Sequence, residues 1–426
     1  MKVLMLGWEF PPHITGGLGT ACYGMAKGLK AKGADVIFVT PKAYGDEDRT
    51  VADIVNASDV EVDIYEKEYK DVINSMTYIE VDSSLIPYAG PEEYEKYYEK
   101  INKDTVLHDK PVFSRKYQFA GGYGKTLYEE VARYAIVVAK IATMYDFDII
   151  HAHDWLTYSA GIAAKRVSGK PLVCHIHATE FDRSGDNINT IVYDLERSGM
   201  MNADRVIAVS NLTANTVINK YGIDPSKVFT VHNAITTSPT DVSKFKKNFD
   251  TKFVTFLGRL TYQKGPEYFI DAAKLILQRD KDVHFVMAGT GDMMPSLVKY
   301  VAKLGISDNF HFTGFLRGEQ VDRMFAMSNV FVMPSVSEPF GLVPLEAMSL
   351  NVPVVISKQS GVSEVLEHAL KVDFWDVNAM ADCIYALLHY DTLSEMYKKY
   401  GKIEIDNMKW ENAAEKIINV YNSILK

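Results

Sequence analysis

Two carboxylates, Glu338 and Glu346, lie eight residues apart in the segment Pro334–Ala347. The segment runs from the end of an apolar strand, Val330–Met333, into a helix that we expect to open at Pro344, because proline is favoured in the first helical turn. Glu338 then belongs to the loop and Glu346 to the first turn of the helix. Both follow the carboxyl end of a strand, which is where open α/β sheets bind ligands.

The backbone of the same loop supplies complementary groups. The N–H groups around Phe340, Gly341, Leu342 and Val343, together with the helix N-terminus, can bind anionic oxygens, while the two carboxylates can accept hydrogen bonds from hydroxyls. A ligand that carries both phosphates and hydroxyls, such as a nucleotide sugar, fits this arrangement. The alternative is an ordinary helix start with acidic residues in its first turn, which is common.

The Glu-x7-Glu spacing in its Ser-Glu-Pro-Phe-Gly-Leu setting resembles the retaining, sugar-nucleotide-dependent glycosyltransferases of the GT-B fold. That group contains the glycogen and starch synthases and the sucrose-phosphate synthases. The resemblance implies that Glu338 binds hydroxyls of the donor sugar and Glu346 the ribose hydroxyls. It also implies an α/β fold of two Rossmann-like, doubly wound parallel-sheet domains that face a central cleft.

Two cations follow the first strand expected in the second half of the chain. Arg259 and Lys264 lie in one strand-to-helix loop, where fixed cations can neutralise the charge that grows on a departing diphosphate. Exposed loop cations are usually only solvated surface, but here Gly258 and Gly265 flank the pair, and the pattern resembles the family's Gly-Arg-x4-Lys-Gly element. Gly289 ends the next strand, and we expect its backbone to line the same donor site.

A glycine-rich stretch, Gly16-Gly17-Leu18-Gly19, precedes the predicted helix 21–32. Gly16 and Gly17 let backbone amides approach a phosphate closely, and in the resembling family this loop contacts the donor diphosphate. The stretch is not a complete G-x-G-x-x-G fingerprint, which argues against a nicotinamide cofactor. We expect no cofactor. Glycogen synthases that use ADP-glucose usually carry a lysine before the glycine pair. This chain has His13-Ile14-Thr15, which leaves the choice between ADP- and UDP-glucose open.

Histidines follow two further strands. His151 and His153 are two residues apart, but the sequence shows no third metal ligand, and we expect no metal site. The resemblance places His153 in the donor-sugar pocket, where it stabilises positive charge at the anomeric centre; the alternative is a structural histidine. Asp154 is interpreted as orienting His153 or capping the next helix. Four residues after other strands are candidates for the acceptor side or the cleft floor, with local turn or cap roles as the alternative: His177, Glu180, Ser210 and Asn233.

The tripeptide Asp146-Phe147-Asp148 matches the metal-diphosphate signature of the other major glycosyltransferase fold. It precedes a strand and therefore lies at the amino end of the sheet, away from the expected ligand site. We interpret it as part of a helix-to-strand loop.

Composition and charge exclude several classes of protein. The chain has 426 residues, of which 47% are hydrophobic and 24% charged, so two globular domains are expected. Its net charge of -9 argues against a nucleic-acid partner, and no run of 18 apolar residues predicts a membrane span. Three scattered cysteines are typical of a reducing compartment, and with no secretory leader apparent we expect a cytoplasmic protein.

Apolar runs alternate with helical patterns in two series, which predicts two parallel sheets. We expect an N-terminal domain at 1–240, a donor domain at 241–405 and a terminal helix at 406–426 that crosses back to the first domain. Residues 62–128 interrupt this alternation of strands and helices, and they hold ten of the 25 tyrosines. We interpret them as an insertion that packs on the first domain; the alternative is a platform for the acceptor sugar.

The function expected is transfer of a glucosyl unit from ADP- or UDP-glucose onto an α-1,4-glucan, with retention of configuration. The first alternative is a transferase to a small sugar phosphate or a lipid-linked acceptor. A sugar-nucleotide epimerase and a non-catalytic sugar-nucleotide sensor are the others, because fold alone does not separate these activities.

Overall fold

The computed structural model describes residues 1–14, 16–64, 113–124, 126–236, 245 and 250–425. The chain divides into two compact units. The first comprises 1–176, 189–206 and 419–426, and the second comprises 177–188 and 207–418. Most of the tyrosine-rich segment predicted as an insertion lies outside the described residues, and the domain boundary predicted at residue 240 stays a prediction.

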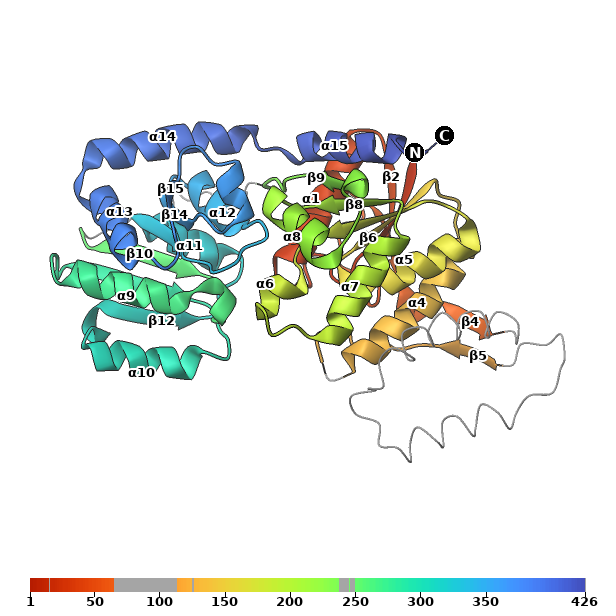
Figure 1. The fold of residues 1–426 in the computed structure, drawn as a ribbon, viewed down its shortest axis with the longest axis horizontal. Helices are drawn as coiled ribbons and strands as arrows, with labels where there is room; N and C mark the ends of the chain where they lie inside the picture. Colours follow the sequence, from red (N-terminus) through yellow and green to blue (C-terminus); the bar gives the residue numbers. More distant parts are fainter. Residues whose placement is uncertain (15, 65–112, 125, 237–244, 246–249, 426) are drawn as a thin grey trace, which may run out of the picture. The chain divides into compact units, whose positions relative to one another are not determined.

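The first sheet has seven strands in the order β3-β2-β1-β6-β7-β8-β9 (Figure 1). Every pairing with a defined register is parallel, and Val3 on the central strand faces Val36 on one side and Ile149 on the other. The strands form around short apolar runs, and residues 3–6 of β1 are fully buried. The strand bounds are β1 Lys2–Leu6, β2 Asp35–Thr40, β3 Asp53–Asn56, β6 Ile149–His153, β7 Leu172–Ile176, β8 Arg205–Ala208 and β9 Val228–Thr230.

Helices connect these strands, and several end at glycines. Helix α5 ends at Gly169 and α8 at Gly222, both with positive φ, which stops a helix with little strain. A two-stranded antiparallel sheet, β4 Glu61–Ile64 with β5 Phe113–Lys116, lies outside the main sheet. The helix bounds are α1 Gly17–Ala31, α4 Leu127–Met144, α5 Trp155–Ser168, α6 Glu180–Ser184, α7 Thr190–Asn202 and α8 Asn211–Tyr221. Helix α1 begins four residues earlier than predicted, so Gly17 is already helical.

The second sheet has six parallel strands in the order β12-β11-β10-β13-β14-β15. The strand bounds are β10 Lys252–Leu257, β11 Val283–Ala288, β12 Phe310–Gly314, β13 Val330–Met333, β14 Val354–Ser357 and β15 Leu370–Val372. The helix bounds are α9 Pro266–Leu277, α10 Met294–Leu304, α11 Glu319–Met327, α12 Val343–Ser349, α13 Val377–His389 and α14 Asp391–Asn407.

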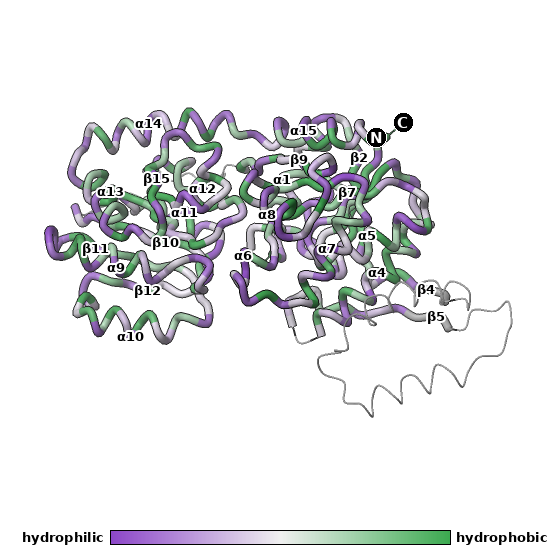
Figure 2. The backbone as a smooth tube through the Cα atoms, in the orientation of Figure 1, coloured by the Kyte–Doolittle hydropathy of each residue, from purple (hydrophilic) through white to green (hydrophobic). Residues whose placement is uncertain are grey.

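Both faces of this second sheet are covered, which explains why its strands are mostly apolar. Along β13, Val330 and Val332 join one buried cluster, whereas Phe331 and Met333 join another, because successive side chains of a strand point to opposite faces. Helices α9, α10 and α13 contribute to the first cluster, and α11, α12 and α14 to the second. The tube coloured by hydropathy shows green stretches along these strands and mixed colours along the outer helices (Figure 2). The prediction of two parallel α/β sheets is confirmed.

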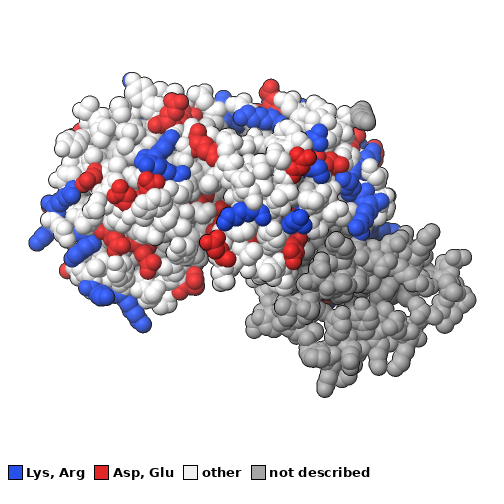
Figure 3. All heavy atoms as spheres, viewed as in Figure 1, with Lys and Arg blue, Asp and Glu red and all other residues white. Residues whose placement is uncertain are grey.

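The last helix, α15 Trp410–Asn422, ends within the first unit, to which residues 419–426 belong. There Tyr421 is fully buried, and Arg205 Nε donates to Ser423 Oγ over 3.2 Å. Within the described part of the chain, no helix has both the length and the apolar character needed to cross a bilayer. Acidic and basic side chains are interspersed on the face of the molecule that Figure 3 shows.

The loop after β11 depends on a glycine that cannot be replaced without strain. Gly289 has φ 134°, and a Cβ at this position would lie 1.8 Å from the carbonyl oxygen of Gly258. Gly289→Ala should therefore lower the stability of the protein by roughly 2–4 kcal/mol, measured as a lower Tm by calorimetry. The control is Gly122→Ala, where nothing lies within 4 Å of the added methyl group, and its Tm should stay near the wild-type value. Equal Tm values for the two variants would contradict this account.

Candidate active site

Glu338 follows β13 in a loop that a neighbouring segment holds in place. Its backbone N–H donates to the carbonyl of Gln359 over 3.0 Å, and its own carbonyl accepts from the N–H of Gly361 over 2.8 Å. Two residues on, the carbonyl of Phe340 accepts from the N–H of Val362 over 2.7 Å. This strand-like pairing fixes the loop between β13 and α12, and only 8% of Glu338 is exposed.

The Glu338 carboxylate pairs with Lys264, which ends the 3-10 turn Tyr262–Lys264 after β10. The same oxygen, Oε2, also lies 3.4 Å from the hydroxyl of Ser335, a fully buried donor that the sequence analysis did not single out. The other oxygen, Oε1, forms no hydrogen bond within the described part of the chain. One side of the carboxylate is thus held by the protein while the other can accept a hydrogen bond from a ligand hydroxyl.

Arg259, the second predicted cation, is exposed and makes no ion pair with any described residue. It lies on the loop that leaves β10, whose backbone is bonded to the loop after β11. Gly258 N–H donates to Ala288 O over 3.1 Å, and Leu260 N–H donates to Thr290 O over 2.9 Å. The structure therefore packs the predicted backbone positions Gly258 and Gly289 against each other beside a guanidinium that is available to an anion.

Helix α12 begins at Val343, one residue before the predicted start. Gly341 precedes it with φ 104°, and the N–H groups of Gly341 and Leu342 donate no hydrogen bond to other described residues. Phe340 is buried and packs with Leu345, so the loop is anchored by its side chain and leaves its amides open.

Glu346 lies in the first turn of α12 and is partly exposed. Burial of its carboxyl group raises its pKa to about 7, and the negative charge of Asp322 on α11 adds to the shift. The neighbouring carboxylate that acts on Glu346 is therefore Asp322, which the sequence did not single out, and not Glu338. A group with this pKa changes its charge close to neutral pH.

In the first unit, three buried histidines lie on two adjacent strands. His151 and His153 both belong to β6 and His175 to β7, and all three are fully buried. Each offers a ring nitrogen, and these three atoms lie within 4.8 Å of one another. The sequence alone shows no third residue beside His151 and His153, whereas the parallel pairing of β6 with β7 places His175 opposite His153.

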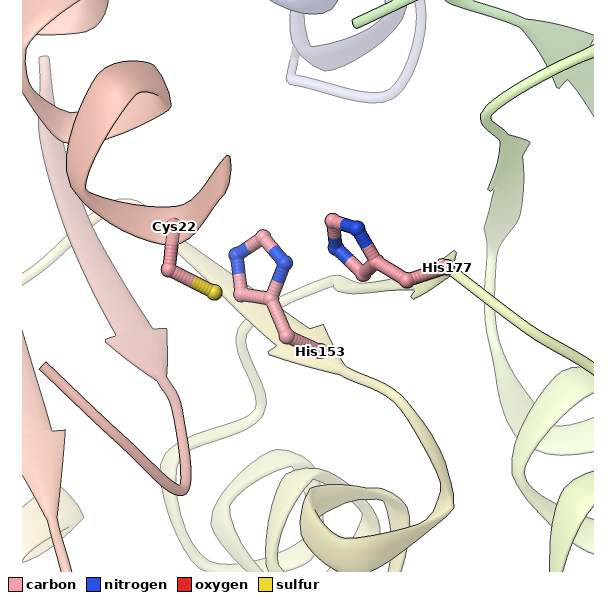
Figure 4. A group of neighbouring side chains, drawn as sticks. All are labelled: Cys22, His153 and His177. Atoms are coloured by element: carbon pink, nitrogen blue, oxygen red, sulfur yellow. The ribbon is translucent and has the colours of Figure 1, made fainter. Parts of the chain in front are cut away.

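His153 also approaches α1. Its ring nitrogen and the Cys22 sulfur lie within 4.8 Å of each other, and in Figure 4 the Cys22 side chain points from the helix toward the ring. Burial raises the pKa of the Cys22 thiol well above its usual value, and the carboxylates of Asp154 and Glu9 raise it further. The thiol therefore stays neutral. Figure 4 also labels His177, which follows the end of β7 and is partly exposed.

Gly16 and Gly17 lie at the N-terminus of α1, and Gly17 is helical and does not belong to a loop before the helix as predicted. Gly16 is the N-cap residue in an extended conformation, and Gly17 is the first residue of the helix. A side chain at Gly16 would meet nothing within 4 Å, so the backbone is open at this end of α1. The Asp-x-Asp tripeptide instead lies at the amino end of β6, where Asp148 accepts a 2.8 Å hydrogen bond from the N–H of Lys2. Its interpretation as a loop is confirmed.

The structure gives local contacts for two of the remaining candidates, Glu180 and Ser210. Glu180 opens α6 and accepts from Ser184 Oγ over 2.6 Å and from Arg183 Nε over 3.2 Å. Ser210 caps α8, because its hydroxyl accepts from the N–H of Thr213 over 3.0 Å. Asn233 is buried after β9. Asp154 occupies the N-cap position of α5 with φ 58° and does not cap the helix through its side chain.

Comparison with known proteins agrees with this geometry. Residues 2–226 match the family model described as the starch synthase catalytic domain, and residues 238–404 match the glycosyl transferases group 1. An uncharacterized glycosyltransferase of Methanocaldococcus jannaschii is 28% identical over 99% of this chain and 98% of its own length. A glycogen synthase of Mycobacterium tuberculosis is 22% identical over 99% of this chain and 94% of its own.

Among solved structures, the sucrose-phosphate synthase of Thermosynechococcus elongatus superposes with a TM-score of 0.70 at 18% identity, covering 99% of this chain and 98% of its own. At this identity the likeness shows the fold, which is GT-B. The starch synthase model spans more than half of the chain, from β1 to α8, and the group 1 model spans the sheet that carries Glu338 and Lys264. The chain therefore belongs to the glycogen and starch synthase-like glycosyltransferases of the GT-B fold.

Proposed function

We propose that the protein transfers a glucosyl unit from ADP- or UDP-glucose onto an α-1,4-glucan with retention of configuration. The observation that carries the proposal is the Lys264–Glu338 pair, which leaves Glu338 Oε1 open beside a fixed cation. The similarity to a glycogen synthase over nearly the whole chain supports the glucan as acceptor.

The chemistry is electrostatic. As the glycosidic bond lengthens, Lys264 and Arg259 stabilise the charge on the leaving diphosphate, and the open amides of Gly341 and Leu342 can donate to anionic oxygens. Glu338 Oε1 accepts from a hydroxyl of the donor sugar, and Glu346 accepts from the ribose hydroxyls. Interactions that strengthen only as this charge develops are those that raise the rate.

His153 is proposed to serve the donor sugar, where a positive charge develops at the anomeric carbon. Its ring is fully buried, so its environment has a low dielectric and its orientation is restricted. Attack by the acceptor on the face from which the diphosphate leaves, with a phosphate oxygen as the base, would give retention without a protein nucleophile.

Product analysis of the purified protein tests this function. ADP-glucose and UDP-glucose are supplied separately with glycogen, with short maltooligosaccharides, or with no acceptor. Nucleotide release accompanied by oligosaccharides lengthened by single α-1,4 units is the expected result, and it also identifies the donor. If a donor binds in a thermal shift assay but no glucan is extended, the glucan proposal fails. Sugar phosphates and lipid-linked acceptors are then the acceptors to test.

Lys264→Ala should lower kcat at saturating donor by about 100-fold or more, because the cation is proposed to act on charge that appears only during bond cleavage. The matched control is Lys398→Ala, which removes the same charge from a surface pair with Glu395 on α14 and should leave kcat unchanged. Unchanged turnover of Lys264→Ala at saturating donor would exclude the proposed role.

Donor affinity should rise with pH through the pKa of Glu346. A pKa of about 7 in the free protein means that the carboxyl is largely protonated at pH 6 and ionised at pH 8, and only the ionised form can accept from both ribose hydroxyls. If binding lowers this pKa well below 6, affinity should be about tenfold higher at pH 8 than at pH 6. Calorimetric titration with the donor nucleotide sugar measures the difference.

The control for this titration is Glu346→Gln, which keeps the size of the side chain but cannot ionise. Its affinity should be low and nearly independent of pH over the same range. A variant that retains the full wild-type pH dependence would assign the titration to another group.

A further inference from the structure

The last turn of α15 places a buried hydroxyl against the histidine cluster of the first unit. The Tyr421 hydroxyl lies 2.6 Å from Nδ1 of His151, and both residues are fully buried. Burial raises the pKa of Tyr421 well above its usual value, so the phenol keeps its proton. Neither residue belongs to the set that the proposed transfer uses.

This contact has a direction. His151 Nδ1 is the one hydrogen-bond partner of the Tyr421 hydroxyl within the described residues. The phenolic O–H is the stronger acid of the two groups and the imidazole nitrogen is the stronger base, and an O–H that did not donate here would be buried without this acceptor. The hydroxyl therefore donates, and Nδ1 of His151 is the acceptor.

The direction of this hydrogen bond determines the tautomer of His151 and, through it, that of His175. A neutral His151 that accepts at Nδ1 carries its proton on Nε2, which lies 3.2 Å from Nδ1 of His175. His151 Nε2–H then donates to His175, whose own proton must be on its Nε2. A single chain of donors, from Tyr421 through His151 to His175, thus holds both rings in the neutral state.

This chain of hydrogen bonds lies beside His153. The ring centroid of His153 is 4.2 Å from that of His151 and 5.3 Å from that of His175, with interplanar angles of 36° and 26°. A proton added to either neighbour would place a positive charge within a few ångströms of His153, in surroundings where charges are poorly screened. It would also reverse one hydrogen bond of the chain.

Other titratable groups border the cluster. Cys22 of α1 lies beside the ring of His153. The carboxylates of Glu9 and Asp154 raise the pKa of the Cys22 thiol, so these two residues border the same side of the cluster. Tyr158 of α5 donates from its hydroxyl to the carbonyl of His175 over 3.0 Å, and His177 follows β7 directly. Tyr421 is the group from α15.

We propose that Tyr421 is a positioning residue that fixes the tautomers of His151 and His175, keeps both rings neutral, and so preserves the ring orientation and electrostatic surroundings of His153. The effect on catalysis rests on the proposed glycosyl transfer. The assignment of the tautomers does not, because it concerns the resting protein.

The first test is NMR of the protein with 15N-labelled histidine, with signals assigned through single His→Gln variants. His151 and His175 should both appear as neutral Nε2–H tautomers from pH 6 to pH 8. In Tyr421→Phe, Nδ1 of His151 loses its donor, and His151 should titrate within this range or populate the Nδ1–H form. A wild-type spectrum with His151 protonated at Nδ1, or with its Nε2 bound to a metal, would overturn the proposal.

The matched control is Tyr134→Phe. Tyr134 is equally buried in the first unit, but its hydroxyl donates to the carbonyl of Val39 over 2.8 Å. Both variants lose one buried hydrogen bond, so both should lower Tm to a similar extent. The Tyr134→Phe variant should keep the wild-type histidine spectrum, whereas identical histidine spectra for both variants would reduce Tyr421 to a packing role.

Activity gives the second test. Tyr421→Phe should reduce kcat about fivefold or more at pH 6 and much less at pH 8.5, with little change in KM for the donor, while Tyr134→Phe follows the wild-type pH profile. Parallel pH profiles for the two variants would overturn the catalytic part of the proposal. If the wild-type protein transfers no glycosyl unit at all, the proposed function fails, and the NMR result alone decides the tautomer assignment.

Discussion

The pairing of Lys264 with Glu338 is the contact on which the second sheet's site depends. It joins the loops after β10 and β13, which are neighbours in the sheet, so the topology itself brings the two side chains within reach. The loops can approach closely because residue 265 is glycine: a Cβ there would lie 2.1 Å from the carbonyl oxygen of Pro334. A buried carboxylate needs such a partner, and once Lys264 and Ser335 occupy one oxygen, the other is left for a ligand.

The parts of this site that follow from local sequence were predictable. Val330–Met333 is a continuous apolar run, and it forms a strand because both faces of the sheet are covered. The proline at 344 and the acid at 346 mark a helix start in the right place, to within one residue. Helix α1 begins at Gly17, earlier than expected. Glycine is tolerated at the N-terminus of a helix, so the helix starts within a glycine-rich stretch whose composition suggests a loop.

Contacts between segments distant in sequence were not predictable. His175 lies beside His151 and His153 only because β6 and β7 pair in one register, and no spacing along the chain encodes that register. Tyr421 reaches His151 across 270 residues and belongs to a helix whose apolar side predicts burial but not its partner. Asp322 likewise acts on Glu346 from a different helix. In each case the sequence shows a residue of ordinary type, and its role arises from packing.

The second unit offers fixed cations and the first unit offers buried histidines that are proposed to be neutral, and the proposed reaction needs both. Near a departing diphosphate, fixed cations lower the energy of the transition state, which suits Lys264 and Arg259. Near an anomeric carbon that becomes positive, an imidazolium would raise that energy, so the rings around His153 must stay neutral at working pH. Histidine titrates close to that pH, and burial alone disfavours its charged form without choosing a tautomer. The hydrogen bond from the Tyr421 hydroxyl selects the tautomer of His151 and, through it, that of His175.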